Sequence, residues 1–237
     1  MVILDVMRFL RTMRNFRAQT WKVIGAVLLV GLVAAGIIMS TLAEIHEEIS
    51  EQHEMHLDSG FQDEVHEDAT PGLTRLAFAL SWIGSPGLMV PVVPLVAGLL
   101  WWKRMRHQAM VLLITSGGAG VLTFLLKLHF RRLRPDLPWA FAHEPTFSFP
   151  SGHSVFAVVL YGTLLYLGLR HLRRARERVA VSIAAVALIL GIGYGRIYLG
   201  VHYPSDVAAG YFVGVVWLLA VMAADWYVRR NEAVVSE

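Results

Sequence analysis

Apolar residues form long runs along this chain, and charged residues gather between the runs. A helix needs about 20 apolar residues to cross the hydrocarbon core of a bilayer. Runs that approach this length cover residues 23–43, 88–102, 109–128, 154–168, 179–198 and 207–226. The pattern therefore predicts an all-α bundle of six membrane-spanning helices. A shorter run, 73–83, cannot cross alone, which leaves a re-entrant or an interfacial helix.

The composition agrees with a membrane protein of one domain. Hydrophobic residues make up 56% of the 237 positions, and the mean hydropathy is +0.54, too apolar for an ordinary soluble domain. No linker is long enough to separate a second domain, so we expect residues 1–237 to form a single unit. The absence of cysteine excludes disulfides and thiolate chemistry. Small residues at 116–120 favour close packing of that span against another helix.

Two segments differ from the apolar runs. Residues 1–22 carry five basic residues and predict either an amphipathic helix on the membrane surface or a solvated basic leader. Residues 44–71 form an acidic segment, with ten carboxylates and no Lys or Arg between 44 and 68. Since charge runs usually face water, we expect a solvated loop or helix outside the membrane. Its histidines, such as His53 and His56, could bind a metal, although no complete zinc signature is present.

The basic residues predict how the bundle is oriented. The N-terminus, the 103–106 loop, the 170–178 loop and the C-terminus are all basic, and six spans place them on one side. By the positive-inside rule that side is the cytoplasm, so segments 44–68, 129–150 and 199–206 face outward. We expect a multi-pass protein of the inner (plasma) membrane with both termini in the cytoplasm. The net charge of +3 does not indicate nucleic acid, because most basic residues flank apolar runs.

One group of basic residues lies on the outer side, contrary to the positive-inside rule. Near the outer face lie Lys127, Arg131, Arg132, Arg134 and Arg196. Charges near membrane depth usually face a cavity or pair with another group and mark a site, and snorkelling to lipid headgroups is the alternative. Lys127 and Arg134 are seven residues apart, so they would share a helix face if the helix continued to Arg134.

Two predicted helices have histidines at their N-termini on the same, outer side. Ser151 precedes Gly152 and His153 at the start of an apolar run, where we expect its side chain to cap the helix. The free N–H groups of a first helical turn attract anions, above all phosphate. At the second mouth, His202 stands two residues before Pro204, a residue type favoured at the first helical position.

Asp206 follows His202 by four residues. At that spacing its carboxylate can accept a hydrogen bond from one imidazole nitrogen and leave the other free to attack. A structural hydrogen bond is the alternative for this pair alone. Together with the cations, the two histidines suit phosphoryl transfer, with one attacking phosphorus and the other protonating the leaving oxygen. This set requires no metal or cofactor, because the cations supply positive charge and no carboxylate cluster is in reach.

Three motifs resemble the signature of the type-2 phosphatidic acid phosphatase superfamily, which includes membrane lipid phosphatases and soluble vanadium haloperoxidases. The motifs are Lys127-x6-Arg134-Pro135, Pro150-Ser151-Gly152-His153 and Arg196-x5-His202-x3-Asp206. By this resemblance, His202 is the nucleophile, Asp206 orients it and His153 is the general acid for the leaving group. The phosphate is bound by Lys127, Arg134, Ser151, Gly152 and Arg196. The third motif of the superfamily usually begins Ser-Arg, whereas Gly195 stands here in place of the serine.

The resemblance implies metal-independent hydrolysis of a lipid phosphate or diphosphate, through a phosphohistidine at the outer membrane face. The substrates it suggests are phosphatidylglycerol phosphate, undecaprenyl diphosphate and phosphatidic acid. Two alternatives stay open. A vanadate-dependent, haloperoxidase-like enzyme is disfavoured by the membrane spans, and a non-catalytic lipid-phosphate binder or transporter by the complete set of expected catalytic residues. The bilayer and its lipid phosphates are the partners indicated, and no protein partner is.

Overall fold

The computed structural model of the chain describes residues 25, 29–31, 33–44 and 53–235, and the elements among them are helices, without a β-strand. The labelled helices are α2 (His53–Glu67), α3 (Pro71–Ile83), α4 (Pro86–Trp102), α5 (Arg106–Phe130), α6 (Gly152–Gly168), α7 (Ala175–Tyr198) and α8 (Pro204–Val235). The all-α prediction is confirmed. The basic segment 1–22 and the side chains of His53 and His56 lie outside the described residues.

Several helices are long and apolar enough to cross a bilayer, as expected of a membrane protein. α5, α7 and the 204–230 part of α8 pass this test alone. α3 and α4 pass it together, bent by 46° at a short break, so the 73–83 run is half of a broken span or of a re-entrant loop. The helices Leu29–Glu44 and Gly152–Gly168 are apolar but shorter. By length and composition, three or four spans are supported, and the count of six stays a prediction.

The core of the bundle lies between α5, α6 and α8. The indole of Trp217 on α8 packs against Gly118 on α5, where an added Cβ would lie only 2.2 Å from the ring. The indole N–H donates to the carbonyl oxygen of Thr115, at 2.8 Å. The predicted close packing of residues 116–120 against another helix is confirmed, because only a residue without a side chain leaves room for this ring.

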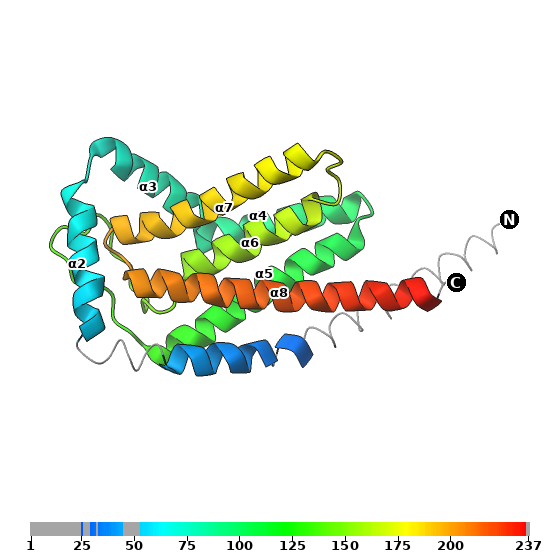
Figure 1. Cartoon of the computed structure of the whole chain (residues 1–237), viewed down its shortest axis with the longest axis horizontal. Helices are drawn as coiled ribbons and strands as arrows, with labels where there is room; N and C mark the ends of the chain where they lie inside the picture. Colours follow the sequence, from blue (N-terminus) through cyan, green and yellow to red (C-terminus); the bar gives the residue numbers. More distant parts are fainter. Residues whose placement is uncertain (1–24, 26–28, 32, 45–52, 236–237) are drawn as a thin grey trace.

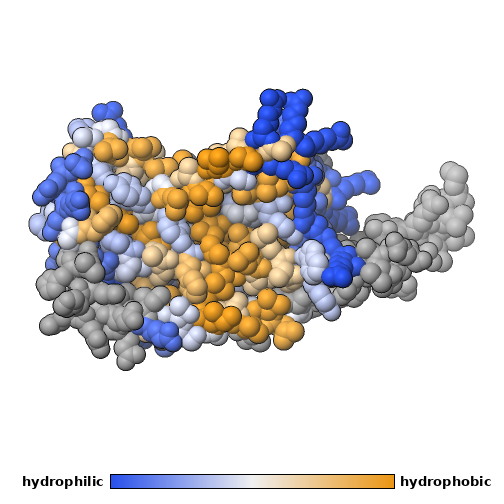
Figure 2. Space-filling model, viewed as in Figure 1, coloured by the Kyte–Doolittle hydropathy of each residue, from blue (hydrophilic) through white to orange (hydrophobic). Residues whose placement is uncertain are grey.

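The long helices run side by side, and α2 lies across one end of the bundle, beside the start of α8 (Figure 1). An apolar band covers the middle of the visible face, with hydrophilic surface toward both ends (Figure 2). On α2, Asp63, Glu64 and Glu67 are exposed, as the acidic pattern predicts. The opposite face of this helix is not solvated, because Asp58 and Gln62 are buried against the bundle.

Candidate active site

A cavity of about 360 Å³ lies at the end of the bundle where α6 and α8 begin. The predicted site residues that line it are Lys127, Arg134, Gly152, His153 and His202. The remaining three, Ser151, Arg196 and Asp206, are buried and adjoin these residues. The α3–α4 junction contributes Ser85 and Pro86, and the connection before α6 contributes Glu144, Pro145 and Thr146.

His202 is held by hydrogen bonds at both ring nitrogens and is only 1% exposed. Its Nδ1 lies 3.3 Å from Oδ2 of Asp206, and its Nε2 lies 3.1 Å from Nη1 of Arg134. A guanidinium group can only donate, so Nε2 accepts and the ring proton resides on Nδ1, facing the carboxylate. The lone pair of Nε2 is therefore directed toward the cations of the cavity.

Asp206 occupies the first turn of α8, which begins at Pro204 as predicted. The positive end of a helix dipole favours an anion at this position. Besides His202, the carboxylate accepts from the Tyr203 backbone N–H at 2.9 Å and from Nη1 of Arg132 at 2.7 Å. These bonds fix the carboxylate that faces the imidazole.

The imidazole of His202 is held in its neutral form. Burial lowers the pKa of His202 well below its ordinary value, and the positive charges of Arg134, Arg196 and Lys127 lower it further. A neutral imidazole has the free lone pair that a nucleophile requires.

Arg134 reaches the cavity from the connection after α5. The helix ends at Phe130, and Arg131 has the left-handed conformation (φ 50°) that terminates it. The helix does not continue to Arg134, so Lys127 and Arg134 do not share a helix face. Pro135 favours extended backbone at the residue before it, and this extended connection brings the guanidinium back to the helix mouths.

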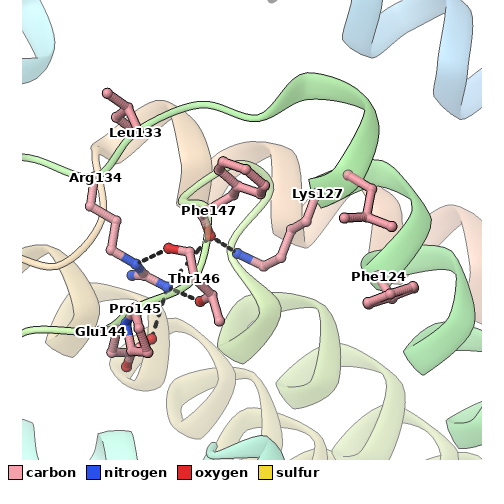
Figure 3. A pocket seen from close by; sticks show the side chains of 9 residues that line it. Phe124, Lys127, Leu133, Arg134, Glu144, Pro145, Thr146 and Phe147 are labelled. Carbon is pink, nitrogen blue, oxygen red and sulfur yellow. Dashed lines mark hydrogen bonds and ion pairs between the residues drawn. The ribbon is translucent and has the colours of Figure 1, made fainter.

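Several oxygens fix the guanidinium of Arg134. It donates to the carbonyl and hydroxyl oxygens of Thr146, at 2.7 and 2.9 Å, and to the carbonyl oxygen of Val201 at 2.6 Å. Lys127 approaches the same loop from the other side and donates to the carbonyl oxygen of Phe147 (Figure 3). Arg131 does not take part, since it is exposed and donates to Leu128 of its own helix.

The N-terminus of α6 carries polar groups that have no hydrogen-bond partner among the described residues. Ser151 occupies the N-cap position with extended backbone, but its side chain makes no cap hydrogen bond, so the predicted capping contact is wrong. Its hydroxyl oxygen is buried without a hydrogen-bond partner among the described residues. Gly152 and His153 begin the helix, where backbone N–H groups have no intrahelical acceptor. An anion at this mouth would satisfy both kinds of group.

Glu144 is a site residue that the motifs do not contain. Its carboxylate pairs with Arg134, at 2.8 Å, and with Arg196. Arg196 also donates to Oγ of Ser81 on α3, at 2.5 Å, while its Nε is buried without a partner among the described residues. The sequence signal for Glu144 is slight: it is one of only two acids, with Asp136, in the basic 129–150 connection.

Glu144 also brings one carboxylate close to both histidines of the site. Ligand atoms of Glu144, His153 and His202 lie within 4.8 Å of one another. This group is poorly suited to a metal cation, because Glu144 and His202 are already hydrogen-bonded to guanidinium groups. The surrounding positive charge favours an anion instead. His153 is 7% exposed and faces the same cavity as His202.

A second cavity, of about 450 Å³, adjoins the first and shares with it Lys127, Arg134 and the loop 144–146. Its outer wall is apolar, formed by Phe124, Leu128 and Leu133, which are 62%, 43% and 77% exposed. Figure 3 shows Phe124 and Leu133 on either side of the cationic groups. A cationic pocket beside an exposed apolar wall suits an amphiphile with an anionic head.

The family model described as "PAP2 superfamily" matches residues 108–230, just over half of the chain and all of the site except Ser81, Ser85 and Pro86. The chain belongs to the PAP2 superfamily. Like its relatives, it is a membrane phosphatase of the hydrolase class.

Relatives of this PAP2 protein cover much of its length. Phosphatidylglycerophosphatase B of Bacillus subtilis is 29% identical over 68% of this chain and 79% of its own. An undecaprenyl-diphosphatase of Sulfolobus acidocaldarius is 32% identical over 60% of this chain and 66% of its own. The crystal structure of a transmembrane PAP2-type phosphatidylglycerolphosphate phosphatase from Bacillus subtilis has the same fold, with a TM-score of 0.74 over 81% of this chain and 96% of that chain, at 24% identity.

Gly195, which replaces the usual serine of the third PAP2 motif, lies where α7 approaches α3. An added Cβ would lie 3.3 Å from the carbonyl oxygen and 3.6 Å from the Cα of Ala77. A serine here would crowd the α3 backbone. The glycine therefore permits the close approach that lets Ser81 of α3 reach Arg196.

Proposed function

We propose that this chain, as a single membrane domain, hydrolyses a lipid phosphate or diphosphate through a phosphohistidine on His202. One observation carries the proposal: Nε2 of His202 faces a cationic cavity while Asp206 holds the opposite ring nitrogen. In a nucleophile paired with an orienter, the orienter fixes the tautomer and stabilises the positive charge that develops on the ring.

In the first step, an incoming phosphate takes over the hydrogen bonds of Arg134, which frees the lone pair of Nε2. Nε2 attacks phosphorus, a P–N bond forms and the bond from phosphorus to the lipid oxygen breaks. The negative charge of the bound phosphate favours the protonated form of His153, which gives its proton to that oxygen. The negative charge on the phosphoryl oxygens is balanced by the groups that surround the cavity: Lys127, Arg134, Arg196, the hydroxyl of Ser151 and the backbone N–H groups that begin α6.

In the second step, water attacks the phosphohistidine. His153, now neutral, accepts a proton from the water as its oxygen bonds to phosphorus and the P–N bond breaks. Inorganic phosphate leaves, His202 is again neutral and His153 is again protonated. The cations of the protein supply the positive charge in both steps, so the proposal requires no metal.

A lipid substrate is favoured by the second cavity. Its exposed apolar wall, at Phe124 and Leu133, would contact the hydrocarbon part while the adjoining cations hold the head. The basic loops 103–106 and 170–178 lie at the end of the bundle opposite the site. If these loops face the cytoplasm of a six-span protein, the site opens on the periplasmic or extracellular side of the plasma membrane.

The relatives define the panel that tests this proposal. Purified protein should release phosphate from phosphatidylglycerol phosphate, undecaprenyl diphosphate or phosphatidic acid in the presence of EDTA. His202→Ala should abolish release, while His171→Ala, which removes an exposed histidine of the α6–α7 loop, should keep it. No release from any of the three lipids, or full activity in His202→Ala, would refute the proposal.

A further inference from the structure

The acidic helix α2 buries one face against the candidate active site. Asp58, Gln62 and Val65 are 6%, 0% and 8% exposed, and their spacing of four and three residues places them on one side of the helix. The helix lies outside the region matched by the PAP2 family model, which begins at residue 108. The contacts that this face makes with the site therefore involve residues outside the three motifs.

Asp58 bonds to the turn that carries the candidate nucleophile. Its Oδ1 accepts from the backbone N–H of Ser205 at 3.1 Å, and its Oδ2 accepts from the Ser205 hydroxyl at 2.5 Å. Oδ2 also accepts from Nη2 of Arg132, at 2.9 Å. Arg132 donates through its other terminal nitrogen to Asp206, so a single guanidinium bridges the two carboxylates. This bridge joins α2 to the carboxylate that faces His202.

Gln62 makes a second connection four residues later. Its Nε2 donates to the backbone carbonyl oxygen of His202 at 3.1 Å, across 140 positions of sequence. Because the side chain is completely buried, this bond has no competition from bulk water. Asp58 thus reaches the orienting carboxylate, and Gln62 reaches the main chain of the histidine itself.

We propose that Asp58 and Gln62 are positioning residues, through which α2 fixes the His202–Asp206 pair for attack. The guanidinium of Arg132 is shared between the two carboxylates, and it also donates to the Ser205 hydroxyl and lies over the Tyr203 ring. Without Asp58, the guanidinium of Arg132 can pair with Asp206 alone and draw that carboxylate away from His202. The distance from Nδ1 of His202 to Oδ2 of Asp206 is already 3.3 Å. A displacement of about 1 Å can cost about a hundredfold in rate.

The inference rests on the proposed function for its kinetic test. Asp58→Asn and Gln62→Ala should each lower kcat about tenfold or more and change KM less than about threefold, because neither side chain lines the cavity. Glu64→Gln and Glu67→Gln remove exposed carboxylates from the same helix and should leave both constants unchanged. Equal kcat in Asp58→Asn, Gln62→Ala and these controls would overturn the proposal.

A double-mutant cycle separates positioning from general damage to the fold. If Asp58 acts through Arg132 on Asp206, Asp58→Asn should cost little further activity once Asp206→Asn is present. If the fold-losses of the two single variants multiply in the double variant, Asp58 does not act through Arg132 on Asp206.

The ring protons of His202 give a readout that needs no turnover. In wild-type protein labelled with ¹⁵N-histidine, NMR should show His202 protonated at Nδ1, and Asp58→Asn and Gln62→Ala should weaken or shift that signal. An unchanged His202 signal in both variants would refute the positioning role even if no lipid is hydrolysed. A wild-type protein inactive on the whole lipid panel, with the expected NMR changes, would refute the proposed function alone.

Discussion

Two aspartates on α8 are completely buried, and each lies beside a histidine and arginines at a different end of the bundle. Asp206 contacts His202 and Arg132 at the cavity. Some five turns further along the helix, the carboxylate of Asp225 accepts hydrogen bonds from His107, Tyr166, Arg170 and Arg229. By residue type alone, the two clusters are alike.

The clusters differ in what is left unpaired. His107 directs Nε2 at Asp225, with 2.5 Å between the atoms, so the histidine nitrogen and the carboxylate satisfy each other. At the other end, His202 directs Nε2 into a cavity, and the neighbouring Ser151 and Arg196 have a hydroxyl and an Nε without partners among the described residues. A buried histidine–aspartate pair is therefore not by itself a reactive site. Polar groups without partners around a cavity distinguish the candidate active site from a structural cluster.

The largest expected difference between the clusters is produced by Asp206→Asn. An amide can donate to Nδ1 and stabilise the wrong tautomer, so kcat should fall about 10³–10⁴-fold with little change in KM. Steady-state kinetics on the preferred lipid would measure this. A loss below about tenfold would mean that Asp206 is a structural partner, as Asp225 is.

Arg134→Gln should lower kcat/KM about 10²–10³-fold, because it removes a charged donor to the phosphoryl oxygens. It should also raise the pKa of His202 toward its ordinary value, since Arg134 is the charged group that lowers that pKa most. A histidine NMR titration checks this direction. In the wild type, His202 should stay neutral as the pH falls below about 6.5, the ordinary value, and should gain its proton at a higher pH in Arg134→Gln.

Ser151→Ala should cost about tenfold in kcat/KM, through a lost hydrogen bond to the phosphate, and should not lower the melting temperature. The hydroxyl has no partner among the described residues to lose. Ser154→Ala is the matched control, because its hydroxyl is also buried without a partner among the described residues but lies within α6, three residues beyond the N-cap position of Ser151. Equal activity in both variants would remove Ser151 from the phosphate site.

Asp225→Asn should have the smallest effect on activity, less than about threefold. It should instead lower the free energy of unfolding by about 1–3 kcal/mol, because two arginines and a histidine lose a buried negative partner. Thermal unfolding and kinetics of the same preparation measure both. A large loss of activity at an unchanged melting temperature would make the second cluster functional, contrary to the comparison.

Local spacing predicted much of the site and could not predict the rest. The four-residue step from His202 to Asp206 lies within one helical turn, so the sequence contains their contact. Glu144 meets its arginines only after the 131–151 connection folds back. Asp58 meets Ser205 across 147 positions, and nothing in the acidic segment distinguishes it from the exposed carboxylates nearby.

The fold shows the same division. Hydrophobic runs located α4 to α7 within four residues of their observed ends and the start of α8 within three, whereas α8 continues nine residues beyond its run, to Val235. The runs did not show that α3 and α4 form one broken span or re-entrant loop with a bend of 46°. The direction of α3 depends on its contacts with α7, which are distant in sequence. The capping contact of Ser151 was predicted from residue type alone, whereas in the structure Ser151 packs against Gly210 of α8 and makes no cap hydrogen bond.

The measurement that tests the central claim most directly is the capture of the covalent intermediate. The protein would be mixed with a lipid carrying a ³²P-labelled phosphate, quenched in alkali within milliseconds to preserve phosphohistidine, digested and mapped by mass spectrometry. We expect the label on His202, absent from His202→Ala and present in His171→Ala. Label on another residue, or normal turnover with no labelled protein at any time, would contradict His202 as the nucleophile.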